Sequence, residues 1–142
     1  MIPKYYEIAL KDMGIHELPG VEADLRVLEY HKHTTLKATS DEVAWCAASM
    51  CCWLEEAGIE GTHSARARDF LKWGEEIKEP IQGCIVVLKR GKNPAQGHVG
   101  IYETSKAGLI KVYGGNQHDS VCYAWFPKTD VLSYRIPKGE IV

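Results

Sequence analysis

One apolar stretch in the first half of the chain decides the fold: Val43-Ala44-Trp45-Cys46-Ala47-Ala48-Ser49-Met50-Cys51-Cys52-Trp53-Leu54-Glu55-Glu56-Ala57-Gly58. Apolar side chains populate nearly every face of a helix formed by these residues, and Gly58 supplies a left-handed stop. The stretch therefore predicts a buried central helix. Two starts are open, because the capping-box pattern Thr39-Ser40-Asp41-Glu42 favours a start near residue 40, whereas an irregular turn at Asp41 places it nearer Ala44.

Shorter elements surround this helix on both sides in the sequence. Helical spacing of apolar residues predicts helices over 3–13, from 21 to about 30, and over 66–73, followed by a charged loop that reaches Pro80. From Cys84 onward, β-branched and aromatic residues form short runs, which predict strands over 84–88, 98–102, 109–113, 121–126 and 131–136. We expect an α+β fold in which N-terminal helices pack on a C-terminal antiparallel β-meander, as a single domain over residues 1–142.

Composition restricts the possible partners. The chain has 142 residues, of which 45% are hydrophobic, and a net charge of -2, so it can form one core and has no basic footprint for nucleic acid. We expect neither a secretory signal at the amino terminus nor insertion in a membrane, and therefore synthesis in the cytoplasm. The five cysteines are an odd number in a chain without an export signal, so we interpret them as free thiols.

Cys46 differs from the other cysteines in its position. A thiol is a good nucleophile only as thiolate, and a helix amino terminus or a neighbouring imidazolium lowers its pKa from about 8.5. Cys46 lies in the first turns of the central helix, whereas the other four lie in the middle of that helix or in strands: Cys51, Cys52, Cys84 and Cys122. We therefore predict that Cys46 is the nucleophile and that the other four are structural.

His98 is the predicted base among the six histidines. It lies between Gly97 and Val99 at the start of a strand, where small neighbours leave access to its ring. A base of this kind needs a third group that bonds its other ring nitrogen. Asn116, after the Gly114-Gly115 turn, is the first candidate, although Asn is also a common turn residue. Gln117 is the alternative, either to orient His98 or to bind a developing oxyanion.

A metal site is a weaker alternative. His31 and His33 are separated by one residue and could chelate from an extended segment, with His118 and Asp119 as distant ligands. A polar helix end explains the pair more simply, since neither Cys-x-x-Cys nor His-Glu-x-x-His spacing accompanies it. We expect no metal and no cofactor.

The motifs together resemble the papain-like peptidoglycan hydrolases of the CHAP and NlpC type, and among them a group of small phage-encoded endolysins. The similar segments extend over most of the chain: Gly14-Ile15-His16-Glu17 before Pro19-Gly20, Trp45-Cys46-Ala47-Ala48, Ala57-Gly58-Ile59, Gly61-Thr62, Gly97-His98-Val99-Gly100, Gly114-Gly115-Asn116-Gln117 and Tyr134-Arg135. Two departures are present. Many CHAP enzymes have Gln before the cysteine and an acidic residue before the matching Asn, where this chain has Trp45 and Gly114.

The resemblance implies a papain-like catalytic domain with Cys46 as nucleophile, His98 as base and a polar residue near Asn116 as orienting group. It implies hydrolysis of a peptidoglycan amide, within the peptides or between muramic acid and alanine, through a thioacyl-enzyme. Gln117 and Trp45 are then candidates for oxyanion or substrate binding. We expect a monomer that reaches the cell wall after the inner membrane is breached. The alternatives are a zinc-dependent amidase that uses His31 and His33, and a non-catalytic peptidoglycan-binding or tail protein that retains the fold.

Overall fold

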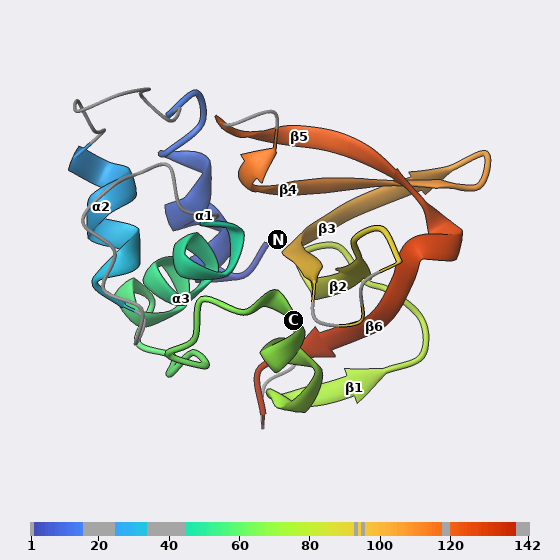
Figure 1. The fold of residues 1–142 in the computed structure, drawn as a ribbon, viewed down its shortest axis with the longest axis horizontal. Helices are drawn as coiled ribbons and strands as arrows, with labels where there is room; N and C mark the ends of the chain where they lie inside the picture. The colour runs from blue at the N-terminus through green and yellow to red at the C-terminus, as the bar shows by residue number, and fades with distance from the viewer. Residues whose placement is uncertain are drawn as a thin grey trace.

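The computed structural model describes residues 2–15, 25–33, 45–92, 94, 96–117 and 120–138. Three helices lie together beside one antiparallel sheet (Figure 1): α1 (Lys4–Leu10), α2 (Leu25–His31) and α3 (Cys46–Glu56). A 3-10 helix, η1 (Ala67–Lys72), leads from the helices into the sheet, and a second, η2 (Lys128–Asp130), precedes the last strand. The predicted α+β class and antiparallel sheet are confirmed.

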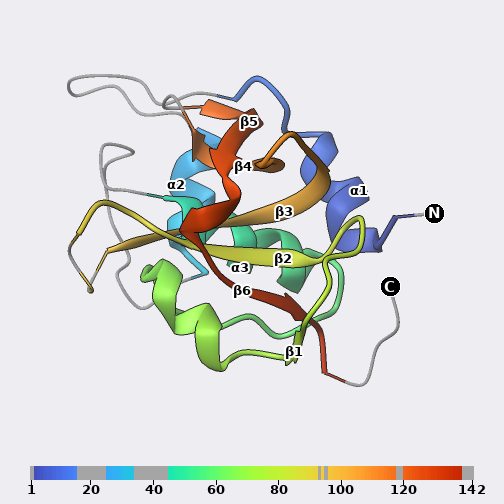
Figure 2. The ribbon, with the colours of Figure 1, turned by 90° about the vertical axis from the view of Figure 1, so that its right-hand side faces the viewer.

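The sheet has six strands in the order β1-β6-β2-β3-β4-β5. Their bounds are β1 (Glu75–Ile77), β2 (Ile85–Lys89), β3 (Gly97–Lys106), β4 (Leu109–Gln117), β5 (Ser120–Pro127) and β6 (Val131–Ile136). β2 to β5 form a meander, but β6 returns to pair with β2 rather than with β5. The prediction of one continuous meander is therefore wrong at its last strand, as Figure 2 shows where β6 lies beside β2.

The charged loop predicted after residue 73 contains a strand. β1 has only three residues, two of them exposed glutamates, so neither length nor apolar alternation marks it in the sequence. It forms because its backbone pairs with β6, from Glu75 opposite Ile136 to Ile77 opposite Tyr134. This edge strand depends on a long-range pairing, which local sequence patterns do not report.

Alternate residues of β2 enter two different cores, so this strand is buried on both faces. Ile85 and Val87 join the larger cluster, which includes nearly the whole of α3. Val86 and Leu88 join a second cluster on the other face, together with apolar residues of β1, β5 and β6. α3 contacts β3 and β4 on the first face, so the helix that carries Cys46 is held directly against the strand that carries His98.

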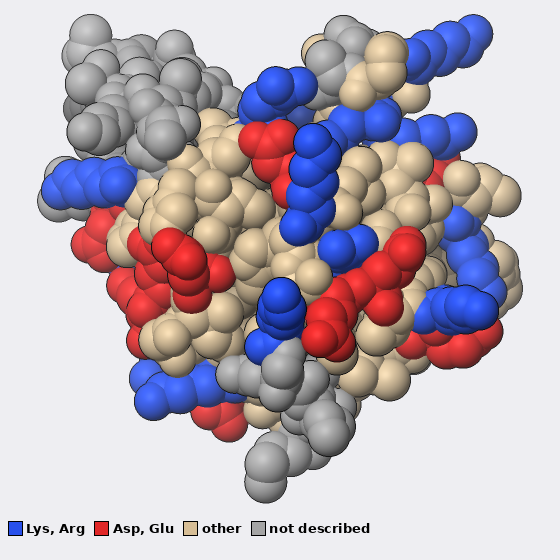
Figure 3. Space-filling view, turned by 90° about the horizontal axis from the view of Figure 1, so that it is seen from below, with Lys and Arg blue, Asp and Glu red and all other residues tan. Residues whose placement is uncertain are grey.

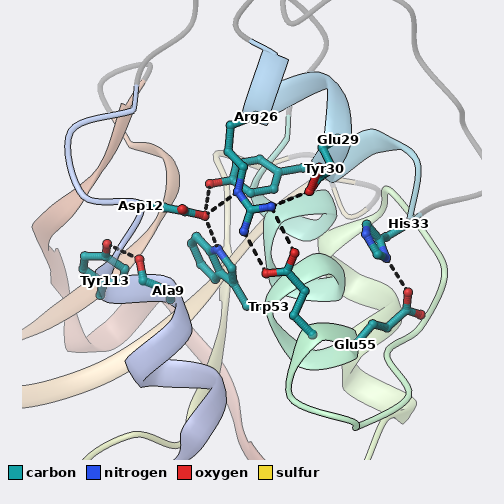
Figure 4. A network of polar contacts seen from close by, with 10 residues as sticks. Ala9, Asp12, Arg26, Glu29, Tyr30, His33, Trp53, Glu55 and Tyr113 are labelled. Atoms are coloured by element: carbon teal, nitrogen blue, oxygen red, sulfur yellow. Dashed lines mark hydrogen bonds and ion pairs between the residues drawn. The ribbon is translucent and has the colours of Figure 1, made fainter.

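A buried carboxylate joins the three helices (Figure 4). Asp12 Oδ2 accepts hydrogen bonds from Arg26 Nε at 2.9 Å, Tyr30 Oη at 2.6 Å and Trp53 Nε1 at 2.9 Å. Arg26 also donates to both carboxylate oxygens of Glu56 on α3. Because a buried carboxylate is stable only when it is paired and hydrogen-bonded, this network fixes α2 and α3 against the end of α1.

The described surface agrees with the modest net charge. Acidic and basic side chains are interspersed over the face seen in Figure 3, which carries no continuous basic area. Within the described residues, the helices all fall short of the length and apolar character needed to cross a membrane.

Candidate functional site

Cys46 is the first residue of α3. Trp45, the residue before it, has φ -130° and ψ 15° and stands at the N-cap position. The later of the two predicted starts is therefore closer to the structure, while the capping-box residues 39–42 lie outside the described residues. At this position the sulfur lies at the positive end of the helix dipole, and the backbone N–H of Cys46 is among the donors that have no acceptor within the helix.

Gly115 lets β4 approach the start of α3 closely. A Cβ at Gly115 would lie 2.5 Å from Ser49 Oγ and 2.6 Å from the Trp45 ring, so a side chain there would displace the first turn of the helix. The Trp45 indole itself is fully buried and stacks on Tyr30, with ring centroids 5.8 Å apart. Its predicted contact with substrate is therefore not available in this structure, and the indole instead holds the first turn of α3 in place.

His98 lies near the start of β3 and faces Cys46. The two side chains are within hydrogen-bonding reach, and the Val99 N–H also donates to the sulfur. One face of the imidazole packs on Phe126, with ring centroids 5.2 Å apart and an interplanar angle of 29°. Both partners are buried, Cys46 at 4% and His98 at 7% exposure, so their interaction is little screened by water.

Gln117 holds the other side of the imidazole. Its Nε2 donates to Val112 O at 3.1 Å and Cys122 O at 2.6 Å, so its Oε1 must face His98. The distance from Oε1 to His98 Nε2 is 2.8 Å. Because an amide oxygen only accepts, the Nε2 proton of His98 is fixed there and Nδ1 is directed to Cys46. This arrangement has the geometry of a nucleophile, base and orienting group.

Asn116, the first candidate for orienting His98, does not make this contact in the described structure. The pairing of β4 with β5 shifts between Gly114 and Gln117, where two residues of β4 face one of β5, and Asn116 has φ 57°. In a regular strand residues 114 and 116 would share a face. Because the bulge inserts one extra residue, Gln117 rather than Asn116 lies on the same face as Gly114, beside His98. Asn116 is instead partly exposed and lines an adjacent pocket.

The surroundings of Cys46 shift the pKa of its thiol in the opposite direction to that of two other buried cysteines, Cys52 and Cys84. Burial raises the pKa of Cys46, but the positive charge of His98, its hydrogen bond and the Val99 N–H lower that pKa by more. Burial likewise lowers the pKa of His98, but the charge and hydrogen bond of Cys46, with the hydrogen bond to Gln117, raise it overall, so each partner favours the charged form of the other. Burial, together with nearby carboxylates, raises the pKa of Cys52 although Arg26 opposes this, and burial raises the pKa of Cys84 to about 11.

This ion pair predicts a pH dependence of thiol alkylation. The pKa of Cys46 is lowered, so its thiolate persists as the pH falls below about 8.5 and disappears only when the pH passes its own pKa. Iodoacetamide should therefore modify Cys46 at about pH 7, where an ordinary thiol is mostly protonated. His98→Ala removes the imidazolium but not the burial, and should raise the pKa of Cys46 and slow its alkylation at this pH. Peptide mass spectrometry identifies the modified cysteine, and equal rates in both proteins would contradict the ion pair.

The predicted histidine ligands do not form a metal site among the described residues. His33 Nδ1 contacts Glu55, whereas the His31 side chain, His118 and Asp119 lie outside the described residues. A different group, Glu29, Cys52 and Glu56, brings possible ligand atoms together. The Arg26 guanidinium already forms ion pairs with both carboxylates of this group, so their negative charge is compensated.

Comparison with known proteins adds no assignment. No protein-family model matches the chain, and a search of curated proteins finds no similar sequence. One residue that the sequence did not point to is Arg90, which lines the pocket beside His98. Its only signal in the sequence is a basic residue before Gly91 between two strands.

Proposed function

We propose that the protein is a cysteine-dependent amide hydrolase of papain-like type that cleaves bacterial peptidoglycan. One observation carries the hydrolase assignment: Cys46 begins a buried helix and meets His98, whose remote nitrogen is held by Gln117. A buried thiolate costs free energy that a merely structural cysteine avoids. A lowered pKa of Cys46 beside a raised pKa of His98 is typical of a catalytic pair.

In the proposed reaction, the Cys46 thiolate attacks the carbonyl carbon of an amide. The carbonyl oxygen becomes an oxyanion, which the Cys46 N–H at the start of α3 can bind. The bond to nitrogen then breaks as His98 Nδ1 gives its proton to the departing amine, leaving a thioester on the enzyme. Neutral His98 next takes a proton from water, the hydroxyl adds to the thioester, and collapse releases a carboxylic acid and the Cys46 thiolate, with His98 protonated again.

The choice of peptidoglycan rests on the resemblance to CHAP and NlpC hydrolases. The motifs that carry it contain the residues of the site: Trp45-Cys46-Ala47-Ala48, Gly97-His98-Val99-Gly100 and Gly114-Gly115-Asn116-Gln117. An α+β domain with a cysteine at the start of a helix that packs on an antiparallel sheet is compatible with it. Under this proposal the protein acts as an endolysin that reaches the wall once the inner membrane is breached.

Product analysis of digested peptidoglycan tests the proposal against its alternatives. Purified peptidoglycan incubated with the protein should release new amines on alanine or diaminopimelate, and free lactyl ends as well if the muramoyl amide is cut. Iodoacetamide should stop this release and EDTA should not, because the nucleophile is a thiolate and no metal takes part. The reverse pattern of inhibition would favour a zinc amidase. Tight binding to the wall with no new amine would favour a binding protein.

A further inference from the structure

A pocket of about 350 Å³ opens beside the site. His98 and Gln117 form one of its sides, and the Phe126 ring of β5 forms an apolar wall. The Phe126 ring is the one that stacks on His98, so the pocket begins directly at the imidazole. A substrate bound at Cys46 can therefore extend into this pocket.

The charges that line the pocket do not cancel. Lys89 Nζ lies 3.9 Å from Asp130 Oδ1, and these two residues compensate each other. Arg90 follows Lys89, lines the same pocket and is exposed, and among the described residues no carboxylate forms an ion pair with it. Cys46 and His98 each favour the charged form of the other, so together they add no net charge. Among the described residues that line the pocket, one positive charge, on Arg90, is left without a carboxylate partner.

Arg90 is close enough to the reacting pair for its charge to act there. It lowers the pKa of both Cys46 and His98, although less than these two residues affect each other. A guanidinium binds a carboxylate through two parallel hydrogen bonds, and an apolar wall beside it suits the carbon chain that carries such a group. A guanidinium that forms an ion pair with no described carboxylate, at the edge of a pocket with an apolar wall, is thus suited to recognise a carboxylate on a neighbouring part of the substrate.

We infer that this pocket is a specificity subsite for a carboxylate of the amide substrate, with Arg90 as the group that binds it and the Phe126 ring as its apolar wall. The inference rests on the proposed hydrolase function and deepens it, because it limits the substrate to amides that carry a nearby acidic group. Such a carboxylate can be on a side chain or at the end of the peptide. Both present the same chemistry to Arg90.

Synthetic stem peptides separate these two sources. Three peptides are compared: one with all carboxylates free, one with the side-chain carboxylates amidated, and one with the terminal carboxylate amidated. Arg90→Gln should lower kcat/KM for the free peptide by about 10- to 100-fold, mainly through KM, since a charged hydrogen bond to carboxylate is lost. The peptide whose recognised carboxylate is amidated should be poor for the wild type and should lose nothing further in Arg90→Gln. Arg90→Lys keeps the positive charge but cannot form two parallel hydrogen bonds to a carboxylate, so it should recover part of the loss.

The control is Lys78→Gln, which removes one positive charge from an exposed lysine outside the pocket and should leave kcat/KM unchanged. Equal losses on all three peptides in Arg90→Gln would overturn the subsite. Calorimetry with Cys46→Ala protein measures binding of the same peptides without turnover. If no peptide is cleaved but Arg90 still discriminates the free from the amidated form, the hydrolase proposal fails and the subsite remains; if cleavage depends on Cys46 but neither assay discriminates, the subsite alone fails.

Discussion

Cys46→Ala is expected to abolish release of amines from peptidoglycan, with a loss in kcat/KM on the order of 10³-fold or more. The reason is that the thiolate is the attacking group and no other described cysteine approaches His98. Cys46→Ser should be nearly as inactive, because a hydroxyl is far harder to ionise than a thiol at the same position. Turnover is measured by reaction of the released amines, and folding by the thermal unfolding midpoint.

A matched control for this prediction lies on the same helix. Cys51 is also buried, but its sulfur contacts Thr62 and Ser64 rather than a histidine. Cys51→Ala should therefore reduce stability by about 1 kcal/mol through lost packing, and should leave kcat/KM close to the wild-type value. The nucleophile assignment would be wrong if folded Cys46→Ala protein kept its activity, or if both alanine variants lost activity equally.

Gln117→Ala should have the next largest effect, a fall in kcat/KM of about 10- to 100-fold. The substitution removes the acceptor of the His98 Nε2 proton, so the imidazole is free to rotate and to change tautomer. Burial lowers the pKa of His98, Cys46 raises it, and the hydrogen bond from His98 to Gln117 raises it further by a smaller amount. Its loss lowers that pKa, and the alkaline limb of the kcat/KM profile should move to lower pH. A pH profile of kcat/KM measures both effects.

Asn116→Gly separates the two neighbouring amides. The residue has φ 57°, which glycine adopts without strain, so this variant should fold and should keep wild-type kcat/KM and the same alkaline limb. Gln117→Ala also leaves Val112 O and Cys122 O without their donor, and should lose about 1 to 3 kcal/mol of stability. Its activity is therefore compared at a temperature where both variants are folded. A larger kinetic loss in Asn116→Gly than in Gln117→Ala would return the orienting role to Asn116.

The parts of the fold that local sequence predicted are those with a strong pattern of their own. The apolar run of α3 and the β-branched runs of β2 and β6 are visible in the sequence because α3 and β2 bury most of their side chains and β6 buries half. β1 was missed, since its exposed glutamates form a strand only by pairing with β6. The return of β6 to β2 was missed for a related reason. Which strand pairs with β2 depends on the residues of other elements that cover its two faces, and the sequence of a single strand does not contain that information.

The residues of the site also differ in whether a local sequence pattern could identify them. Residue type and position marked Cys46 and His98 in advance, because a cysteine at a helix start and a histidine between small residues on a strand are local features. The identity of the group that bonds His98 depended on the bulge in β4. A shift of one residue turns the side chains of a strand to the opposite face, so the extra residue places Gln117 rather than Asn116 beside His98.

The sequence by itself thus determined the α+β class and the buried central helix, and it singled out Cys46 and His98 as candidates without showing that they meet. Only the tertiary structure decided that Gln117 bonds His98, that the Trp45 ring is buried and that Arg90 lines a pocket beside the pair. The physical reason is that helix formation and burial follow from periodic patterns within a few turns of chain. Hydrogen bonds between strands, pKa values and pocket walls depend on atoms that long-range pairing brings together.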